Sequence, residues 1–240
     1  MNRGSYSVMK RERVYEKYKQ FGISKEQETL WMDEFKYELK QREYEYILTK
    51  YISLLQINPQ ALLQLRTTGC CTVFLPEELF DMDFPGHYFR RIRSVAMSIP
   101  CNTRPCTEVK CKLTLLKNSI RKSSLVNNHS YTREAVDDKR FNDDFGSMQS
   151  FVFSMLQNDK GLSETNLSNL RYLPFVGSGV ISEWQLEFPA SPSKNKPRQF
   201  NHDTIADIIF HLCYTAREGG DILRNAAIAH LKTRIEEAQG

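Results

Sequence analysis

Residues 109–115 read Val-Lys-Cys-Lys-Leu-Thr-Leu, so that apolar and polar side chains alternate over the whole stretch. Successive side chains of a β-strand point to opposite faces, and this alternation is typical of a strand with one buried and one solvated face. The same period of two recurs at residues 93–99, 183–188 and 208–214. These runs predict antiparallel strands, and we expect them to form a β-sandwich-like domain.

The N-terminal part of the chain has helical spacing instead. Residues 24–27 read Ser-Lys-Glu-Gln, the form of a capping box in which two side chains satisfy free backbone amides. Between residues 24 and 56 there is no Gly or Pro, and apolar residues recur three or four positions apart on both sides of a charged middle. We predict one long amphipathic helix over residues 24–56. No strand is expected before residue 69.

Two further helices carry signals at their ends. Asn58-Pro59 fits an N-cap followed by Pro at the first helical position, and this short helix should stop near Gly69. Near the C-terminus, Asp221 is expected to cap an amphipathic helix that runs to about Glu237.

The predicted fold class is therefore α+β and mainly β. A helical segment over residues 1–68 precedes a β-sandwich-like domain over residues 69–240, which ends in a helix. Residues 121–140 and 189–199 are polar, and the second of these is rich in Pro. Both stretches are expected to be loops.

The composition limits the classes of partner. Hydrophobic residues make up 40% of the chain and charged residues 26%, a balance that excludes disorder of the whole chain. The net charge is only +4, and Lys and Arg are interleaved with Asp and Glu along most of the sequence. A nucleic-acid-binding protein concentrates its basic residues on one face or stripe. We therefore expect no nucleic-acid partner.

Membrane and export signals are also missing from the sequence. The charged N-terminus is not followed by the apolar core of a signal peptide. No stretch approaches the roughly 18 apolar residues of a membrane-spanning helix. We expect a soluble chain that does not use a Sec signal and does not itself insert into a membrane.

The six cysteines give no zinc signature. No CxxC pair occurs, and the five-residue steps from Cys101 to Cys106 to Cys111 match no common zinc spacing. Cys111 lies in an alternating run and is interpreted as a small buried hydrophobe. A bridge between Cys101 and Cys106 across a Pro-containing turn stays open for an oxidising medium. We expect no metal and no cofactor.

Catalytic motifs are not found. The sequence contains no P-loop, dinucleotide-binding, zinc-protease or nucleophile-elbow pattern. His211 and Cys213 would share one strand face with parallel side chains, which gives no activating geometry for a cysteine nucleophile. Asp137-Asp138 and Asp143-Asp144 lie in a polar stretch without an EF-hand pattern and are interpreted as solvated loop residues. We expect no enzyme and no catalytic residues.

The densest aromatic and basic cluster is residues 84–93, Phe-Pro-Gly-His-Tyr-Phe-Arg-Arg-Ile-Arg. Pro85-Gly86 is typical of a turn, and the residues after it begin a strand. Arginines beside aromatic rings can also hold an acidic partner. A second turn cluster lies at residues 158–161. The candidate partner contacts in these two clusters are Phe84, His87, Tyr88, Arg90, Arg91, Asn158 and Asp159.

Several phrases resemble one family, in the order in which that family has them. Residues 75–92 read Leu-Pro-Glu-Glu-Leu-Phe-Asp-Met-Asp-Phe-Pro-Gly-His-Tyr-Phe-Arg-Arg-Ile, and further phrases stand at residues 157–161, 171–175 and 214–220. Together the phrases span about residues 40–220. Here the chain resembles the A components of Tc toxins, which are insecticidal toxin complexes. The resemblance covers the C-terminal TcB-binding domain and the adjoining end of the channel helix.

This resemblance implies a domain that receives the B component, TcB. In that family, A components form pentameric bells around a translocation channel, and their C-terminal domains build the entrance funnel where the B–C cocoon docks. The resemblance thus implies TcB as partner and a pentamer within a complete A component. It also implies a toxin complex that is cytoplasmic before release and extracellular afterwards. Residues 1–68 would be the end of the channel helix, and residues 69–240 the docking domain.

A second reading stays open. The chain could be a free-standing β-sandwich that binds carbohydrate or another surface ligand through its loops. The aromatic residues near 84–89 and the loops at 121–140 and 189–199 favour this alternative.

Overall fold

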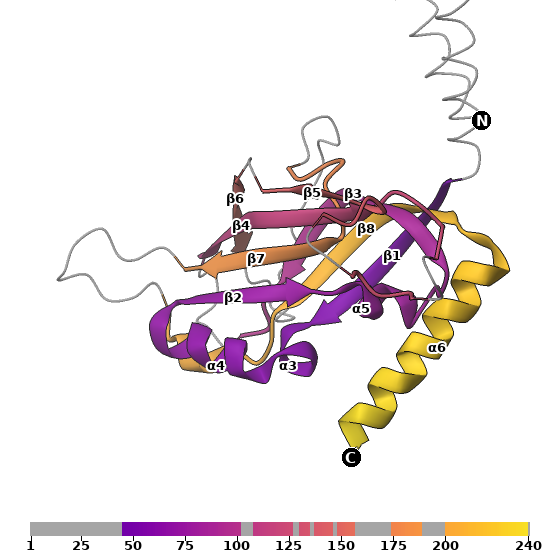
Figure 1. Ribbon diagram of the computed structural model, residues 1–240. Helices are drawn as coiled ribbons and strands as arrows, with labels where there is room; N and C mark the ends of the chain where they lie inside the picture. Colours follow the sequence, from indigo (N-terminus) through magenta and orange to yellow (C-terminus); the bar gives the residue numbers. More distant parts are fainter. Residues whose placement is uncertain are drawn as a thin grey trace, which may run out of the picture. The chain divides into compact units, whose positions relative to one another are not determined.

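The fold is that of a computed structural model (Figure 1). The structure describes seven ranges of the chain, which are 45–101, 108–126, 130–134, 137–145, 148–156, 174–188 and 200–239. From Tyr46 onward the described residues belong to one compact unit.

Eight strands and several helices make up this unit. The strands are β1 (Glu45–Ser53), β2 (Cys70–Leu75), β3 (His87–Ser98), β4 (Glu108–Arg121), β5 (Phe141–Asp144), β6 (Gln149–Leu156), β7 (Ile181–Glu187) and β8 (Ile209–Glu218). The helices are α3 (Leu54–Ile57), α4 (Pro59–Thr68), α5 (Glu77–Asp81), the 3₁₀ turn η1 (His202–Thr204) and α6 (Gly220–Gln239).

The strands form two sheets (Figure 1). The smaller sheet has the order β1-β8-β3, and β3 and β8 pair antiparallel from His87↔Glu218 to Ser98↔Ile209. The larger sheet has the order β2-β7-β4-β5, and β6 pairs with β4 beside β5. In the larger sheet, β4 pairs antiparallel with β5, β6 and β7. The antiparallel prediction is confirmed.

One hydrophobic core joins the two sheets. The inward side chains of β8, such as Phe210 and Leu212, and those of β7, such as Trp184, belong to the same buried cluster. All three are fully buried. The Trp184 indole N–H donates to the Ser182 hydroxyl at 2.7 Å, so its polar edge is satisfied inside the core. The alternating runs therefore mark the core faces, and the sandwich-like prediction is confirmed.

The short helix after Asn58 is also confirmed. The Asn58 side chain accepts a hydrogen bond from the Ala61 amide at 3.0 Å. Gly69 follows the last turn with φ of 81°, and its amide donates to the Leu65 carbonyl at 2.8 Å. Gly suits this left-handed position because it has no Cβ.

The predicted helix over residues 24–56 is wrong over residues 45–53, and so is the expectation of no strand before residue 69. Residues 24–44 lie outside the described part of the chain, but Glu45–Ser53 is strand β1, beside β8. Ile52 is buried and Leu48 packs on the core, whereas Tyr51 is 67% exposed. The apolar residues of this stretch stand at both odd and even positions, so no period of two marks the strand, although its aromatic and β-branched residues favour one.

The C-terminal helix is confirmed, but Asp221 is not its N-cap, because the helix begins at Gly220, two residues before the start that a cap at Asp221 implies. Asp221 lies in its first turn, where a carboxylate complements the helix dipole. Leu223 and Ala227 are buried in a small second cluster with Tyr131. Most other side chains of α6 are partly or fully exposed, and the helix projects from the end of the sandwich (Figure 1).

Candidate functional site

The candidate site is built around α5, the short helix that follows β2. Pro76 stands before its first turn in an extended conformation, and Glu77 and Glu78 occupy that turn. Phe80 and Asp81 are both fully buried. The helix thus brings three carboxylates to the junction of the sandwich and α6.

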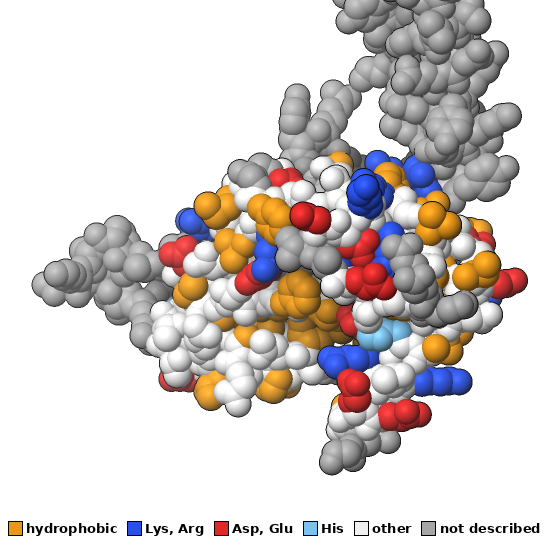
Figure 2. Space-filling model, viewed as in Figure 1, with side chains coloured by type: hydrophobic (Ala, Val, Ile, Leu, Met, Phe, Trp, Pro, Cys, Tyr) orange, Lys and Arg blue, Asp and Glu red, His pale blue; other side chains and the backbone are white. Residues whose placement is uncertain are grey.

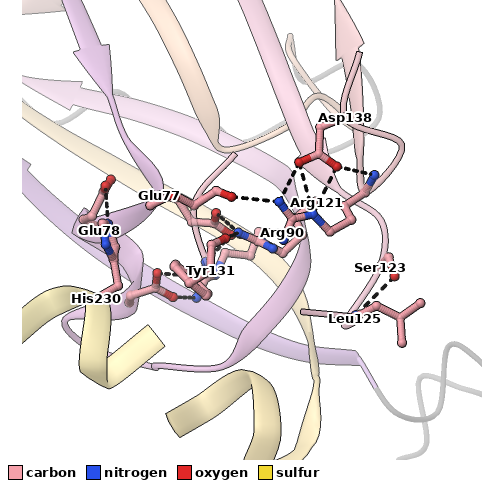
Figure 3. Close-up of polar contacts among 12 residues, drawn as sticks. Glu77, Glu78, Arg90, Arg121, Ser123, Leu125, Tyr131, Asp138 and His230 are labelled. Atoms are coloured by element: carbon pink, nitrogen blue, oxygen red, sulfur yellow. Dashed lines mark hydrogen bonds and ion pairs between the residues drawn. The ribbon is translucent and has the colours of Figure 1, made fainter. Parts of the chain in front are cut away.

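Asp81 forms the centre of a buried polar network, and Figure 3 shows its partners Arg90 and Tyr131. The Arg90 guanidinium, which is only 3% exposed, donates to an Asp81 oxygen at 2.6 Å and to the Phe84 carbonyl at 3.0 Å. The Tyr131 hydroxyl donates to the other Asp81 oxygen. A buried carboxylate needs such partners, because desolvation of an unpaired charge is costly.

A second arginine extends the network. Arg121, at the end of β4, donates through Nε and Nη2 to the two Glu77 oxygens at 2.8 and 2.9 Å. Its Nη2 also donates to the Tyr131 carbonyl at 2.7 Å. The guanidinium stacks between the rings of Tyr131 and Phe141, at 4.5 and 4.6 Å from their centroids. Arg121 is 2% exposed and joins α5, β4, β5 and the 130–134 segment.

The electrostatics of this network follow from its burial. Burial raises the pKa of Asp81, and the Arg90 charge opposes that rise. Burial also raises the pKa of Tyr131, and the neighbouring Glu77 and Asp81 charges add to the effect. Tyr131 is therefore protonated at neutral pH and acts as a hydrogen-bond donor.

The segment near Tyr131 is tied down by Arg140. Its guanidinium donates to the carbonyls of Ser130 at 2.8 Å and Thr132 at 2.7 Å, and it pairs with Asp138 at 2.6 Å. Arg140 is 3% exposed. The loop predicted at 121–140 is confirmed for the described residues 122–126, 130–134 and 137–140, which belong to no strand or helix. The interpretation of Asp138 as a solvated residue is wrong, because its side chain is buried against Arg140.

The acidic pairs of the sequence are not brought together as a metal site. Asp138 pairs with Arg140, and Asp143 pairs with Arg133. The interpretation of Asp143-Asp144 as loop residues is wrong, because both belong to strand β5. Across the described ranges, no group of three or more His, Cys, Asp or Glu side chains is placed to hold a metal ion.

Helix α6 joins the site through His230. Its Nε2 lies 3.0 Å from a Glu78 oxygen, and its ring packs on Tyr131 with 5.5 Å between centroids. Figure 3 shows this contact beside the buried arginines, so α5 lies between the core network and α6.

A cavity of about 670 Å³ opens between these elements, and we call it the α5–α6 cavity. Its apolar lining comes from Phe74, Pro76, Tyr131, Phe141, Phe145 and Ile181. Its charged lining comes from Glu77, Glu78, Lys117, Arg133, Asp143, His230 and Arg234. Figure 2 shows hydrophobic side chains gathered in the middle of this face, with charged ones around them. The volume is in the range of small-molecule pockets in proteins.

Two predicted contact residues, Phe84 and His87, line a second cavity of about 300 Å³ with Tyr46. The His87 ring packs edge-on against both aromatic rings, at 5.7 Å from Phe84 and 5.5 Å from Tyr46. Burial lowers the pKa of His87, and the nearby Arg90 charge lowers it further.

Tyr88 and Arg91 flank a backbone irregularity. Phe89 lies between Tyr88 and Arg91 and has a φ of 54°, at the point where the pairing register of β3 and β8 shifts. A bulky residue with positive φ is a conformational outlier. The guanidinium carbons of Arg91 and Arg217 lie 4.7 and 4.1 Å from the Phe89 centroid. The aromatic rings at 84–89 thus pack on the protein itself, which weakens their case as a carbohydrate platform.

The remaining predicted contacts divide. Arg90 is buried in the Asp81 network, so its side chain is not on the surface and its role in this structure is to hold α5 against β3. Asn158 and Asp159 lie outside the described residues.

His211 and Cys213 do share one face of β8, and the His211 Nε2 lies 3.0 Å from the Ser98 hydroxyl. The suggested bridge partner of Cys101, Cys106, is also outside the described part.

Sequence reasoning missed Glu77, Asp81, Arg121 and Tyr131. The available signal was Arg121, a charge at the end of an alternating apolar run. Its partner Glu77 is 44 positions away, and Asp81 is 50 positions from Tyr131. Only the fold shows that these residues meet.

Comparison with known proteins gives the family. The family described as the Tc toxin complex TcA C-terminal TcB-binding domain matches residues 25–216. The chain belongs to this family. The match runs from before β1 to near the end of β8 and includes the whole of the α5–β3 segment.

The relatives of this TcB-binding domain are larger proteins. Toxin subunit YenA2 of Yersinia entomophaga is 32% identical over 179 residues, which cover 72% of the chain and 13% of YenA2. Among solved structures, Yersinia pseudotuberculosis TcaA-TcaB has a TM-score of 0.42 at 17% identity and covers 72% of the chain and 10% of its own length. Morganella morganii TcdA4 has a TM-score of 0.41 at 19% identity, with 79% and 8% covered. The family assignment rests on the sequence match.

Proposed function

We propose that the chain is a non-enzymatic assembly module of a Tc toxin A component and that it docks TcB of the B–C cocoon at the channel entrance. The family match over residues 25–216 carries this proposal. The site geometry supports it, because Asp81, Glu77 and their arginines bond to one another and hold the fold. Structural ion-pair networks also shift pKa values, so the raised pKa of Asp81 requires no catalytic role.

The docking module in this proposal is the sandwich of residues 69–240, together with β1, α3 and α4 at residues 45–68. Within a complete A component it would stand as one of five copies around the channel entrance. The complex would act outside the producing cell after assembly in its cytoplasm. Among the residues described, no helix is long and apolar enough to cross a membrane.

The proposed contact surface includes Phe84, His87, Tyr88 and Arg91, together with Asn158 and Asp159. Arg91 is partly exposed beside Arg217, and both guanidinium groups lie over Phe89. Aromatic and arginine side chains are enriched at the centre of protein interfaces.

Binding to an immobilised B–C complex, followed by interferometry, tests the proposal. The 240-residue chain should bind in a saturable manner. Arg91→Glu should weaken binding by about tenfold or more, whereas Lys232→Glu on the exposed end of α6 should change it less than about twofold. Thermal melting of each variant controls for folding. An absence of saturable binding by the folded wild-type chain would overturn the proposal.

A further inference from the structure

We propose that the α5–α6 cavity receives an apolar side chain from TcB and is thus the anchor point of the docking surface. This inference rests on the proposed function and adds the place and the chemistry of the contact. The cavity, its charges and its aromatic rim each bear on the choice of occupant.

The rim of the cavity exposes apolar surface. Phe145, directly after β5, is 65% exposed, and Phe74 on β2 is 53% exposed. Both line the cavity with Ile181, which packs on the core below. Large apolar side chains gathered around a hollow and edged by polar groups are typical of a protein-binding site.

The charges around the cavity indicate an uncharged occupant. Arg133 pairs with Asp143, and His230 lies 3.0 Å from Glu78. Lys117 reaches Glu183 at 2.6 Å, and Glu77 is held by Arg121. Because these groups already have polar partners, a charged ligand would have to compete with an existing contact. An apolar side chain gains from the phenylalanines without breaking an ion pair.

The walls of the cavity are fixed in advance. One wall is α5, held by the Arg121–Glu77 pair, and another is the 130–134 segment, whose carbonyls accept from Arg121 and Arg140. A pocket that is already ordered loses little entropy on binding. Arg90 links this cavity to the proposed contact Phe84, because its guanidinium donates to Glu77, which lines the cavity, at 3.5 Å and to the Phe84 carbonyl at 3.0 Å.

A charge at the rim tests this inference. In Phe145→Asp, docking would bury an unpaired carboxylate, so affinity for the B–C complex should fall about a hundredfold or more. Phe145→Ala should weaken binding by about tenfold. The matched controls are Leu63→Asp and Leu63→Ala on α4, where Leu63 is 54% exposed and outside the cavity. Both should bind within about twofold of wild type.

A photoreactive phenylalanine analogue at position 145 provides a second readout that does not depend on affinity. It should form a crosslink to TcB, and the same analogue at position 63 should not. Since Phe145 is mostly exposed, circular dichroism and melting should show that all variants fold.

The outcomes separate the two proposals. Two results would overturn the cavity assignment and leave the docking function intact. In the first, wild type binds and Phe145→Asp has the same affinity for the B–C complex. In the second, substitutions at positions 145 and 63 lower that affinity equally. A change in self-association of Phe145→Asp without a change in B–C affinity would assign the cavity to a second copy and also overturn it. No binding by the folded wild-type chain would overturn the docking function and the cavity assignment together.

Discussion

The phenolic hydroxyl of Tyr131 donates a hydrogen bond to the fully buried carboxylate of Asp81, 50 positions earlier in the chain. This contact joins the segment between β4 and β5 to helix α5. Arg90 holds the other oxygen of the same carboxylate. Because Glu77 and Tyr131 of this network line the α5–α6 cavity, the network helps to fix the shape of the cavity. It is therefore the first target for mutation.

Loss of the Tyr131 hydroxyl should destabilise the fold. In Tyr131→Phe the buried Asp81 loses one of its donors, and we expect a decrease of about 1–3 kcal/mol in the free energy of unfolding. Urea unfolding measures the change. Tyr51→Phe, at a side chain that is 67% exposed, is the control and should change stability by less than about 0.5 kcal/mol. Equal effects in the two variants would contradict the role of Tyr131.

Trp184 should be the most sensitive core position of β7. Its side chain is fully buried, and its ring packs edge-on against Phe175 with 4.9 Å between centroids. We expect Trp184→Ala to lower the free energy of unfolding by about 3–5 kcal/mol. Phe74→Ala on the neighbouring strand should cost much less, since that ring is half exposed. A loss at Trp184 below about 1 kcal/mol in chemical denaturation would speak against this packing.

The Asp138–Arg140 pair should make the stability of the protein fall as the pH becomes acidic. Hydrogen bonds from Arg140 hold the pKa of Asp138 well below its ordinary value of 3.8. A carboxylate with a lowered pKa stabilises the fold above its unfolded pKa, and this contribution is lost as pH falls through the folded pKa. Asp138→Asn should be less stable than wild type at neutral pH, and the difference should shrink below about pH 4. Asp137→Asn is the control, and a constant difference at all pH values would contradict the pairing.

Cys71 and Cys111 should resist alkylation in the native protein. Burial raises the pKa of each thiol to about 12, so the reactive thiolate is scarce at pH 8 as well as inaccessible. Mass spectrometry after brief treatment with iodoacetamide should find both residues unmodified until denaturant is added. Modification at the same rate with and without denaturant would show that Cys71 and Cys111 do not lie on the buried faces of β2 and β4.

Strand β1 limits how many residues can be deleted from the N-terminus without loss of the fold. Deletion of residues 1–56 would remove Ile52 and Leu54, both of which are buried in the core. We expect that deletion to abolish cooperative unfolding, whereas deletion of residues 1–44 should leave a folded sandwich. Near-ultraviolet circular dichroism with thermal melts distinguishes the two. A folded product from the longer deletion would mean that β1 is dispensable.

Local signals in the sequence were enough for most regular elements. The alternation at residues 109–115 and the Asn58 and Gly69 signals of α4 depend on neighbours in sequence, and both predictions are confirmed. Strand β1 was missed because the apolar residues of 45–53 do not alternate, and its place beside β8 is what makes the segment a strand. Such a choice depends on tertiary contacts and not on propensity.

The site was less accessible to sequence reasoning. Residues 75–92 drew attention to Arg90 and Arg91 as a basic pair, but neighbouring positions on β3 face opposite ways. Arg90 therefore points inward to Asp81, and Arg91 lies over Phe89 outside. The cavity walls come from β2, β4, β5, β7, α5 and α6, and no local pattern brings those elements together.

Hydrogen–deuterium exchange of the 240-residue chain, with and without saturating B–C complex, tests the docking function most directly. The account predicts slower exchange on binding in peptides that cover residues 84–92 and 141–145, with no change in the peptides of α4. Exchange that is unchanged in every peptide would contradict the claim that this chain docks TcB.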